Sequence, residues 1–304
     1  WVNLTFQPAP TSTPLVREVR GLAASDALWV LLNDGSLYRA DAGALRLTKV
    51  GAFDVTTTDA EVLDLVATDA GVFVVRNGDV LRCPGPCAST ADFSESLNFT
   101  GVEEGFGACS HDGRVVVTSR INTITTLYEF NHDTQLFEAL SAGSITQGER
   151  CAFDAAGDLS LPSADGVVRL FSGGGSTVEP IDAGLPATWR MAATSGAAGL
   201  LVGGGSGARF ARRSGGAWSG LTPVSPDALM QVVLPLQPGE FLSAGTHNGS
   251  GGVTVYRDDG STLTPLAPQP AIHAQRGGAV SVDEVYLGGA AAEDASDVGV
   301  RGRR

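Results

Sequence analysis

Three glutamates recur at a constant spacing in the first third of the chain. Glu18, Glu61 and Glu104 are separated from one another by steps of 43 residues. Residues at equal intervals take equivalent places in a repeated structure, so their carboxylates are expected to lie at one end of the molecule. Converging carboxylates are the oxygen ligands that Ca²⁺ prefers, and the pattern therefore suggests a calcium site. The simpler interpretation, which we favour, is three solvated charges in loops.

Three further side chains that can bind an anion or transfer a proton are expected near the same end. Arg150, Arg190 and His273 lie where the strands closest to the axis are expected to begin. With the glutamates they would form a ligand-binding site, or the acid–base centre of an enzyme acting on carbohydrate, such as a glycoside hydrolase or a lyase. The sequence contains no serine-hydrolase elbow, phosphate-binding loop or paired zinc ligands. We therefore assign no catalytic residue and expect a binding protein.

The four cysteines form two pairs. Cys83-Pro-Gly-Pro-Cys87 brackets a turn, and we expect a disulfide that locks the tip of a hairpin. Cys109 and Cys151 fall at matching places in neighbouring repeats, where either two buried thiols or a bond between them fits the spacing. A disulfide predicts an oxidising compartment, which means the periplasm, the cell surface or the medium.

The elements that must position these side chains form a repeat of 40 to 47 residues. Its clearest marker is a triplet that follows a turn containing Gly, Asp or Asn. The middle residue of the triplet is apolar or aromatic, and the third is arginine in most copies. The copies are Leu37-Tyr38-Arg39, Val80-Leu81-Arg82, Leu127-Tyr128-Glu129, Val167-Val168-Arg169, Arg209-Phe210-Ala211, Val255-Tyr256-Arg257 and Gly299-Val300-Arg301. An arginine repeated at one position is expected to be architectural and to pair with acidic residues of the neighbouring unit. No helical period of useful length accompanies the repeat.

A period in the forties with about four strands per unit is typical of propeller blades. We therefore predict an all-β fold, a seven-bladed β-propeller of four-stranded antiparallel blades in a single domain, residues 1–304. The predicted blades are approximately residues 17–50, 60–99, 104–141, 148–182, 189–224, 230–267, and 271–304 with 1–10.

The first ten residues are predicted to complete the last blade. Trp1-x-x-Leu4-Thr5 reappears as Trp218-x-x-Leu221-Thr222, where it closes an internal unit. The last unit has only three strands of its own. The N-terminal strand fits the vacancy, and this pairing would close the ring by joining its two ends and leave no free sheet edge.

Charge composition argues against nucleic acid and anionic membranes as partners. The net charge is −13, and Lys49 is the single lysine among 20 basic residues. Phosphate binding needs a clustered basic face, and no such cluster is evident before the short run at 301–304. No apolar run is long enough to span a membrane. We expect a monomer.

The expected location is outside the cytoplasm. The chain starts at Trp1 and not at Met, which suggests a processed form from which an export signal was removed. A secreted, periplasmic or cell-surface protein fits, and so does a lipoprotein-anchored one. Preference for Arg over Lys, with abundant Ala and Gly, suggests a GC-rich bacterial genome.

One turn carries a resemblance to a known group of repeats. Asp258-Asp-Gly260-Ser-Thr262-Leu263 follows the third strand of the sixth unit, with less complete copies at 41–43 and 173–177. The chain resembles the seven-bladed β-propeller superfamily, and looks closest to extracellular propellers with bacterial neuraminidase (BNR, or Asp-box) repeats. In such repeats the aspartate binds the turn's own backbone amides, so the resemblance implies a structural role for it.

A rigid ring that displays variable loops is suited to recognition. We expect the loops at 54–61, 98–106 and 223–230 to bind a protein or a glycan on one face of the ring. A fold does not fix a function, and the carbohydrate-active enzyme stays the alternative.

Overall fold

The computed structural model describes most of the chain. Its described residues are 2–10, 18–41, 43–99, 101–140, 144–148, 150–154, 156–181, 189–194, 200–204, 210–214, 217–220, 228–237, 240–247, 250–258, 263–265, 273–279, 284–290 and 298–303. Beyond residue 181 it describes the strand backbones and a subset of their side chains. The described elements are strands, apart from two 3-10 turns, η1 (Thr58–Ala60) and η2 (Thr90–Asp92). Among the described residues, no helix is long and apolar enough to cross a membrane.

The described strands form six sheets, and in five of them the strands follow chain order. The sixth has eight strands, in the order β2 (Val19–Ala24), β3 (Ala27–Leu32), β4 (Ser36–Asp41), β5 (Arg46–Ala52), β1 (Val2–Gln7), β29 (Val298–Arg303), β28 (Val285–Ala290) and β27 (His273–Ala279).

The other five sheets each contain four or five antiparallel strands. They are β6 (Val62–Thr68), β7 (Gly71–Arg76), β8 (Asp79–Cys83) and β9 (Ser94–Asn98); β10 (Glu104–His111), β11 (Arg114–Ile121), β12 (Ile124–Asn131) and β13 (Leu136–Ala139), with β14 (Ile145–Thr146) paired to β12; β15 (Ala152–Phe153), β16 (Leu159–Ser163), β17 (Gly166–Leu170) and β18 (Ser176–Glu179); β19 (Trp189–Thr194), β20 (Leu200–Gly204), β21 (Phe210–Ser214) and β22 (Ala217–Gly220); and β23 (Ala228–Gln237), β24 (Glu240–His247), β25 (Ser250–Asp258) and β26 (Leu263–Pro265).

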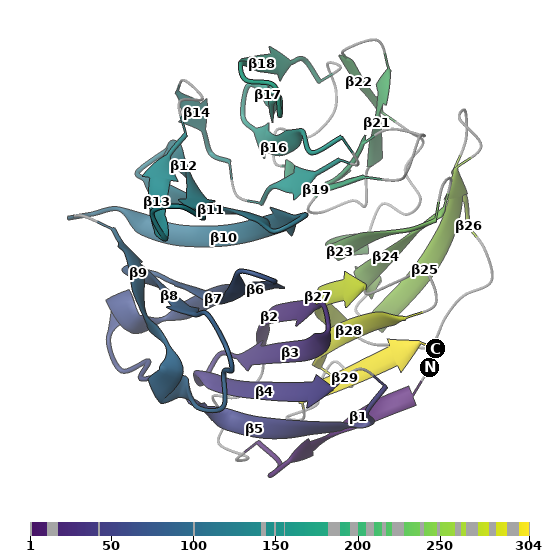
Figure 1. The fold of residues 1–304 in the computed structure, drawn as a ribbon. Helices are drawn as coiled ribbons and strands as arrows, with labels where there is room; N and C mark the ends of the chain where they lie inside the picture. The colour runs from purple at the N-terminus through teal and green to yellow at the C-terminus, as the bar shows by residue number, and fades with distance from the viewer. Residues whose placement is uncertain are drawn as a thin grey trace.

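The sheets are arranged around a common centre, with the first strand of each set innermost (Figure 1). Each innermost strand packs against the next. The contacts run β2 to β6, β6 to β10, β10 to β15, β15 to β19, β19 to β23, β23 to β27, and β27 back to β2. The N-terminal ends of these strands therefore surround one point, which is where the sequence placed its candidate site.

β1 joins the two ends of the chain. It pairs antiparallel with β29, with Val2 opposite Gly302 and Leu4 opposite Val300. Its second half pairs parallel with β5, a contact that the sequence did not predict. Leu4 is buried, and the Phe6 ring lies edge-on to Tyr38 at 4.8 Å. Trp1, which carries part of the sequence motif, lies outside the described residues.

The core lies between neighbouring sheets, and β3 illustrates why its sequence is a continuous apolar run. Successive residues of a strand face opposite sides of the sheet. Leu28, Val30 and Leu32 therefore pack in the cluster on one side, with Leu4 of β1. Trp29 and Leu31 pack in the cluster on the other side, with Val72 and Val74 of β7. A strand covered on both faces needs apolar residues at every position, and fully burying each one contributes roughly 1.5–3 kcal/mol.

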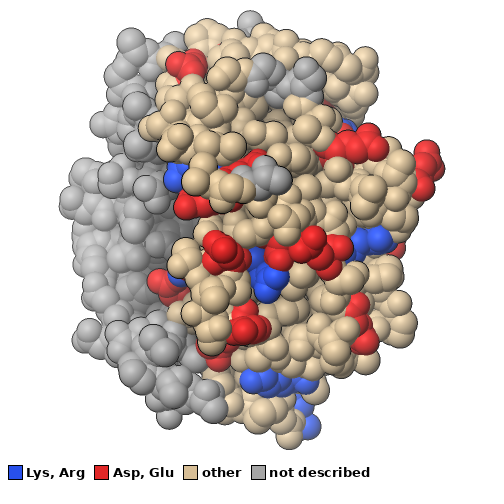
Figure 2. Space-filling view, turned by 90° about the vertical axis from the view of Figure 1, so that its left-hand side faces the viewer, with Lys and Arg blue, Asp and Glu red and all other residues tan. Residues whose placement is uncertain are grey.

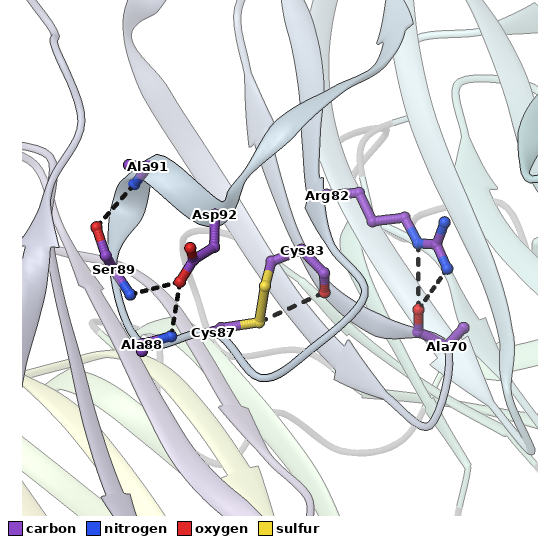
Figure 3. The surroundings of a disulfide bond; sticks show 8 residues. All are labelled: Ala70, Arg82, Cys83, Cys87, Ala88, Ser89, Ala91 and Asp92. Carbon is purple, nitrogen blue, oxygen red and sulfur yellow. Dashed lines mark hydrogen bonds between the residues drawn. A yellow bond between two sulfur atoms is a disulfide. The ribbon is translucent and has the colours of Figure 1, made fainter.

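Both cysteine pairs are disulfides. Cys83 and Cys87 close the hairpin that follows β8 (Figure 3). Cys109 and Cys151 are also bonded, with their Cα atoms 5.6 Å apart. The sequence left this second pair open. The bond forms because β10 packs against β15, which brings the two sulfurs together between neighbouring sheets.

Candidate functional site

Six of the innermost strands share one irregularity at their N-terminal ends. The register against the second strand shifts between Val19 and Gly21 in β2 and between Val62 and Asp64 in β6, and at equivalent places in β10, β19, β23 and β27. The residues skipped by the six shifts are Arg20, Leu63, Phe106, Arg190, Gln231 and Gln275. Such β-bulges bend a strand and re-aim its side chains, and they are common beside binding sites. We call this end of the innermost strands the mouth.

Glu18 and Glu61 meet at the mouth around a single guanidinium. Arg20 Nη2 lies 3.0 Å from Glu18 Oε2 and 3.2 Å from Glu61 Oε1. The side chains of Arg20, Glu18 and Glu61 keep 29%, 45% and 47% of their surface exposed. Ion pairs this exposed contribute little to stability, so these groups remain accessible for binding at small cost. The structure thus brings Glu18 and Glu61 together, with Arg20 between them.

Arg276 holds three bulges together. Its Nε donates to the carbonyl oxygen of Arg20 at 2.5 Å, its Nη1 to Gln275 O at 2.9 Å and its Nη2 to Leu63 O at 3.3 Å. All three acceptors are residues that the register shift leaves out of the ladder. A bulge leaves its extra residue without a partner on the neighbouring strand, and Arg276 supplies donors to these carbonyls. Gln275 adds a bond of its own, because its Oε1 accepts from Val19 N at 2.8 Å.

The charge of Arg150 also acts on this group. Burial, followed by the positive charge of Arg150, lowers the pKa of Arg276 to about 9, and Arg20 acts in the same direction. The carboxylates of Asp64 and Glu18 oppose this change. Asp64 is buried, and it accepts from its neighbour Leu65 N at 2.9 Å and from Ala108 N of β10 at 3.1 Å. Arg276 thus lies under the influence of the charges of Arg20, Arg150, Glu18 and Asp64.

Glu104 occupies the equivalent place on β10. It lies opposite Arg120 of β11 and is exposed. The Arg120 guanidinium stacks on the ring of Phe106, with its Cζ 3.9 Å from the ring centroid. Phe106 is the bulged residue of β10, so the same irregularity presents an aromatic ring here where β2 presents Arg20.

The two remaining predicted residues are placed by their backbones alone. Arg190 is the bulged residue of β19, and His273 is the first residue of β27. Their side chains lie outside the described residues. The same holds for residues 259–262, which form most of the turn that carries the Asp-box resemblance.

A metal centre is a separate question. Among the described residues, no group of three or more His, Cys, Asp or Glu side chains is close enough to hold a metal ion. Glu18 and Glu61 share Arg20, and a cation there would have to compete with that guanidinium. The calcium site stays a prediction.

Several of these residues were missed by sequence reasoning. Arg20, Arg276 and Asp64 were not among the predicted site residues. Arg20 does lie two residues after the repeating glutamate, which is a usable signal. Arg276 acts on carbonyls more than 200 residues away, and no spacing in the sequence indicates that.

The arginines of the repeated triplet correct one expectation. They were expected to pair with acidic residues of the neighbouring unit. Where the structure describes them, the ion pairs lie within one sheet: Arg39 with Asp41 at 3.0 Å, Arg169 with Asp154 at 2.8 Å and Arg257 with Glu240 at 2.9 Å. Arg82 instead donates to Ala70 O, and its guanidinium lies 4.5 Å from the ring centroid of Phe130 in the next sheet. A charged side chain on the third strand reaches its own hairpin turns more easily than those of a neighbour.

Comparison with known proteins bears on the fold. No protein-family model matches the chain, and no curated protein matches it. It is similar to the structure of a streptogramin B lyase, with a TM-score of 0.72, 14% identity and 95% of each chain covered. Virginiamycin B lyase from Staphylococcus aureus gives a TM-score of 0.72 at 14% identity, with 97% of each chain covered. YCF48 from Cyanidioschyzon merolae gives 0.66 at 12% identity, with 95% of this chain and 96% of that chain covered.

These neighbours are β-propellers. The chain has the β-propeller fold. At such low identity the likeness concerns architecture alone, and a fold hosts many functions. The function of this propeller therefore depends on the residues at its mouth and not on its fold.

Proposed function

We propose that the propeller has seven blades and that β1 closes it. The eight-stranded sheet then consists of two blades, β2 to β5 and β27 to β29 with β1, joined where β1 touches both. The cyclic packing of the innermost strands supports this assignment, because β27 returns to β2. A closed ring holds the seven strand ends of the mouth at fixed distances. This rigidity is what a binding site needs.

We further propose that the protein is an exported, non-enzymatic propeller that binds a protein or a glycan at the mouth. The observation that carries this proposal is the Glu18–Arg20–Glu61 group. Its side chains are charged and accessible, and the strands that present them are fixed from behind by Arg276. Two disulfides support a site of action in an oxidising compartment, such as the periplasm, the cell surface or the medium.

The chemistry of the mouth favours a polar ligand that has both donors and acceptors. Exposed carboxylate oxygens of Glu18 and Glu61 accept hydrogen bonds from hydroxyl or amide groups, and Arg20 donates to carbonyl or carboxylate oxygens. Phe106 and Arg120 add a flat stacked surface on the neighbouring strand. Sugars and peptide backbones both offer this combination of polar groups and apolar faces.

The experiment is a binding screen on glycan and peptide arrays with three proteins. The parent protein is expected to bind a defined subset of ligands. Arg20→Ala is expected to lose about tenfold or more in affinity, because a charged hydrogen-bonding group contributes roughly 1.5–3 kcal/mol. The control is Arg257→Ala, which removes an arginine–glutamate pair outside the mouth, where Arg257 Nη2 lies 2.9 Å from Glu240 Oε1. Loss of binding in both variants, or in neither, would count against the mouth as the site.

A further inference from the structure

A second basic feature lies far from the mouth, on the outer side of the molecule. A pocket of about 390 Å³ opens between the outer strands of the first sheet and the hairpin closed by Cys83 and Cys87. Its lining includes Arg39, Asp41, Arg46, Thr48, Lys49 and Cys87. It therefore holds the chain's single lysine and two arginines, in a protein whose net charge is −13.

The strand pairing accounts for the gathering of these side chains. Arg39 of β4 lies directly opposite Thr48 of β5, and Tyr38 lies opposite Lys49. Directly paired residues present their side chains on the same face of a sheet, and residues two apart along a strand share that face. Arg46 and Thr48 therefore line the pocket beside Arg39. Lys49 pairs with Tyr38 and by the same alternation lies on the other face, and it borders the pocket from there.

The positive charge in the pocket is only partly neutralised. Arg39 Nη2 forms an ion pair with Asp41 Oδ1 at 3.0 Å. Its Nε is shielded from solvent and has no hydrogen-bond partner in the part of the chain that the structure describes. Within the described ranges, neither Arg46 nor Lys49 has an acidic partner. Basic side chains also gather at one end of the face in Figure 2, the end where Figure 1 draws β1 and β5, whereas acidic side chains spread over its middle.

The opposite wall of the pocket is held rigidly. The Cys83–Cys87 bond shortens the hairpin, and η2 follows at once with a capping box in which Ser89 Oγ accepts from Ala91 N and Asp92 Oδ2 accepts from Ser89 N (Figure 3). Thr90 Oγ1 donates to Ala52 O of β5 at 3.4 Å, which ties this wall to the strand that carries Lys49. A wall that is fixed before binding lowers the entropy cost of holding a ligand.

We propose that this pocket binds a sugar-sized ligand that carries an oxyanion: a carboxylate, a sulfate or a phosphate. Guanidinium groups bind such oxyanions through paired hydrogen bonds, and an ammonium adds a point charge. A volume of about 390 Å³ is at the lower end of the range for ligand pockets, which suits a monosaccharide. The site is separate from the mouth and does not depend on the function proposed there.

The test is isothermal titration of the parent protein with four probes: glucuronate, N-acetylglucosamine 6-sulfate, glucose 6-phosphate and uncharged glucose. At least one charged probe is expected to bind tenfold or more tightly than glucose, and more weakly as salt is added. The rank of the charged probes identifies which oxyanion the pocket prefers. Absence of binding by every charged probe at millimolar concentration, or equal binding of glucose, would overturn the proposal.

Variants locate the site. Arg46→Gln with Lys49→Gln keeps two exposed polar side chains and is expected to weaken binding of the charged probe tenfold or more. Arg257→Gln, an exposed arginine outside the pocket, is the control and should bind as the parent does. If the Arg46/Lys49 variant binds the probe as tightly as the parent, the pocket is not the site.

Discussion

At the scale of single residues, Arg276 is the side chain on which the mouth depends most. One planar guanidinium serves three carbonyl oxygens that belong to β2, β6 and β27. The arrangement costs free energy, because burial and two neighbouring arginines lower its pKa to about 9. A lysine in its place would present a single charged point and could not satisfy three separate acceptors.

We predict that Arg276→Met destabilises the protein by about 2 kcal/mol. The reason is that three partly buried carbonyl oxygens lose their donor, and an unsatisfied buried group costs roughly 1–3 kcal/mol. Urea unfolding measures the change. Arg257→Met removes an exposed pair and should change the free energy of unfolding by less than about 1 kcal/mol. Equal effects of the two substitutions would show that Arg276 does no more than a surface arginine.

The positions of Glu18 and Glu61 at the mouth could be predicted from the sequence, whereas the role of Arg276 could not. Glu18 and Glu61 occupy equivalent places in a repeat, and a repeat converts sequence spacing into spatial proximity. Arg276 is not part of the repeating pattern. The residues at the equivalent position, directly after the register shift in the other innermost strands, are Gly21, Asp64, Gly107, Met191 and Val232. A residue that departs from the repeat can be interpreted only once the bulges are known.

At the scale of the elements, the close approach of the innermost strands sets what each position accepts. Gly21 of β2 follows the bulge, and a Cβ added there would lie 2.4 Å from Leu65 Cβ and 2.8 Å from Leu65 N. Because one of these atoms belongs to the backbone of β6, a rotation of the leucine cannot relieve the clash. At Gly21, the close approach of β2 and β6 therefore leaves no room for a side chain.

Gly21→Ala is expected to lower the free energy of unfolding by about 1–3 kcal/mol, the usual cost of overpacking a core. Thermal melting and urea unfolding measure it. Gly43→Ala and Gly85→Ala have open space around the added carbon but a positive φ, so they are poor controls. Gly173→Ala has open space and no such φ, and it should melt like the parent. A Gly21→Ala protein as stable as the parent would mean that β2 and β6 can separate without cost.

Strands and their order were largely predictable, whereas the bulges were not. Apolar runs such as that of β3 indicate strands covered on both faces, and Gly- and Asp-rich turns mark their ends. A bulge depends on which residue of one strand pairs with which residue of the next. In β2 the shift between Val19 and Gly21 leaves no trace in the alternation of residue types. For the same reason, the sequence indicated where the mouth lies and not how it is built.

At the scale of the whole molecule, closure by β1 makes a direct prediction. Deleting residues 1–10 removes the ladder with β29, the buried Leu4 and the edge-on packing of Phe6 against Tyr38. Loss of large buried side chains costs about 2–5 kcal/mol each, which is comparable to much of a domain's net stability. We expect the deleted protein to melt well below the parent, and a synthetic peptide of residues 1–10 to restore part of the loss. Unchanged melting after deletion would contradict closure by this strand.

Calcium binding is tested at the same scale. If Glu18, Glu61 and Glu104 hold Ca²⁺, binding to the folded state alone should raise the melting midpoint as calcium is added. Glu61→Gln should abolish that increase, and Glu129→Gln, outside the mouth, should not. A melting midpoint that stays constant up to millimolar calcium would contradict the calcium site. Glu18 and Glu61 would then serve only as ion-pair partners of Arg20.

The central claim is that ligands bind at the mouth. It is tested most directly by hydrogen–deuterium exchange of the parent protein with and without a ligand selected on the arrays. Binding at the mouth predicts slower exchange of backbone amides at 18–21, 61–65 and 104–108, with the outer strands β5, β9 and β13 unchanged. Slower exchange confined to the outer strands, with the three mouth segments unaffected, would contradict it.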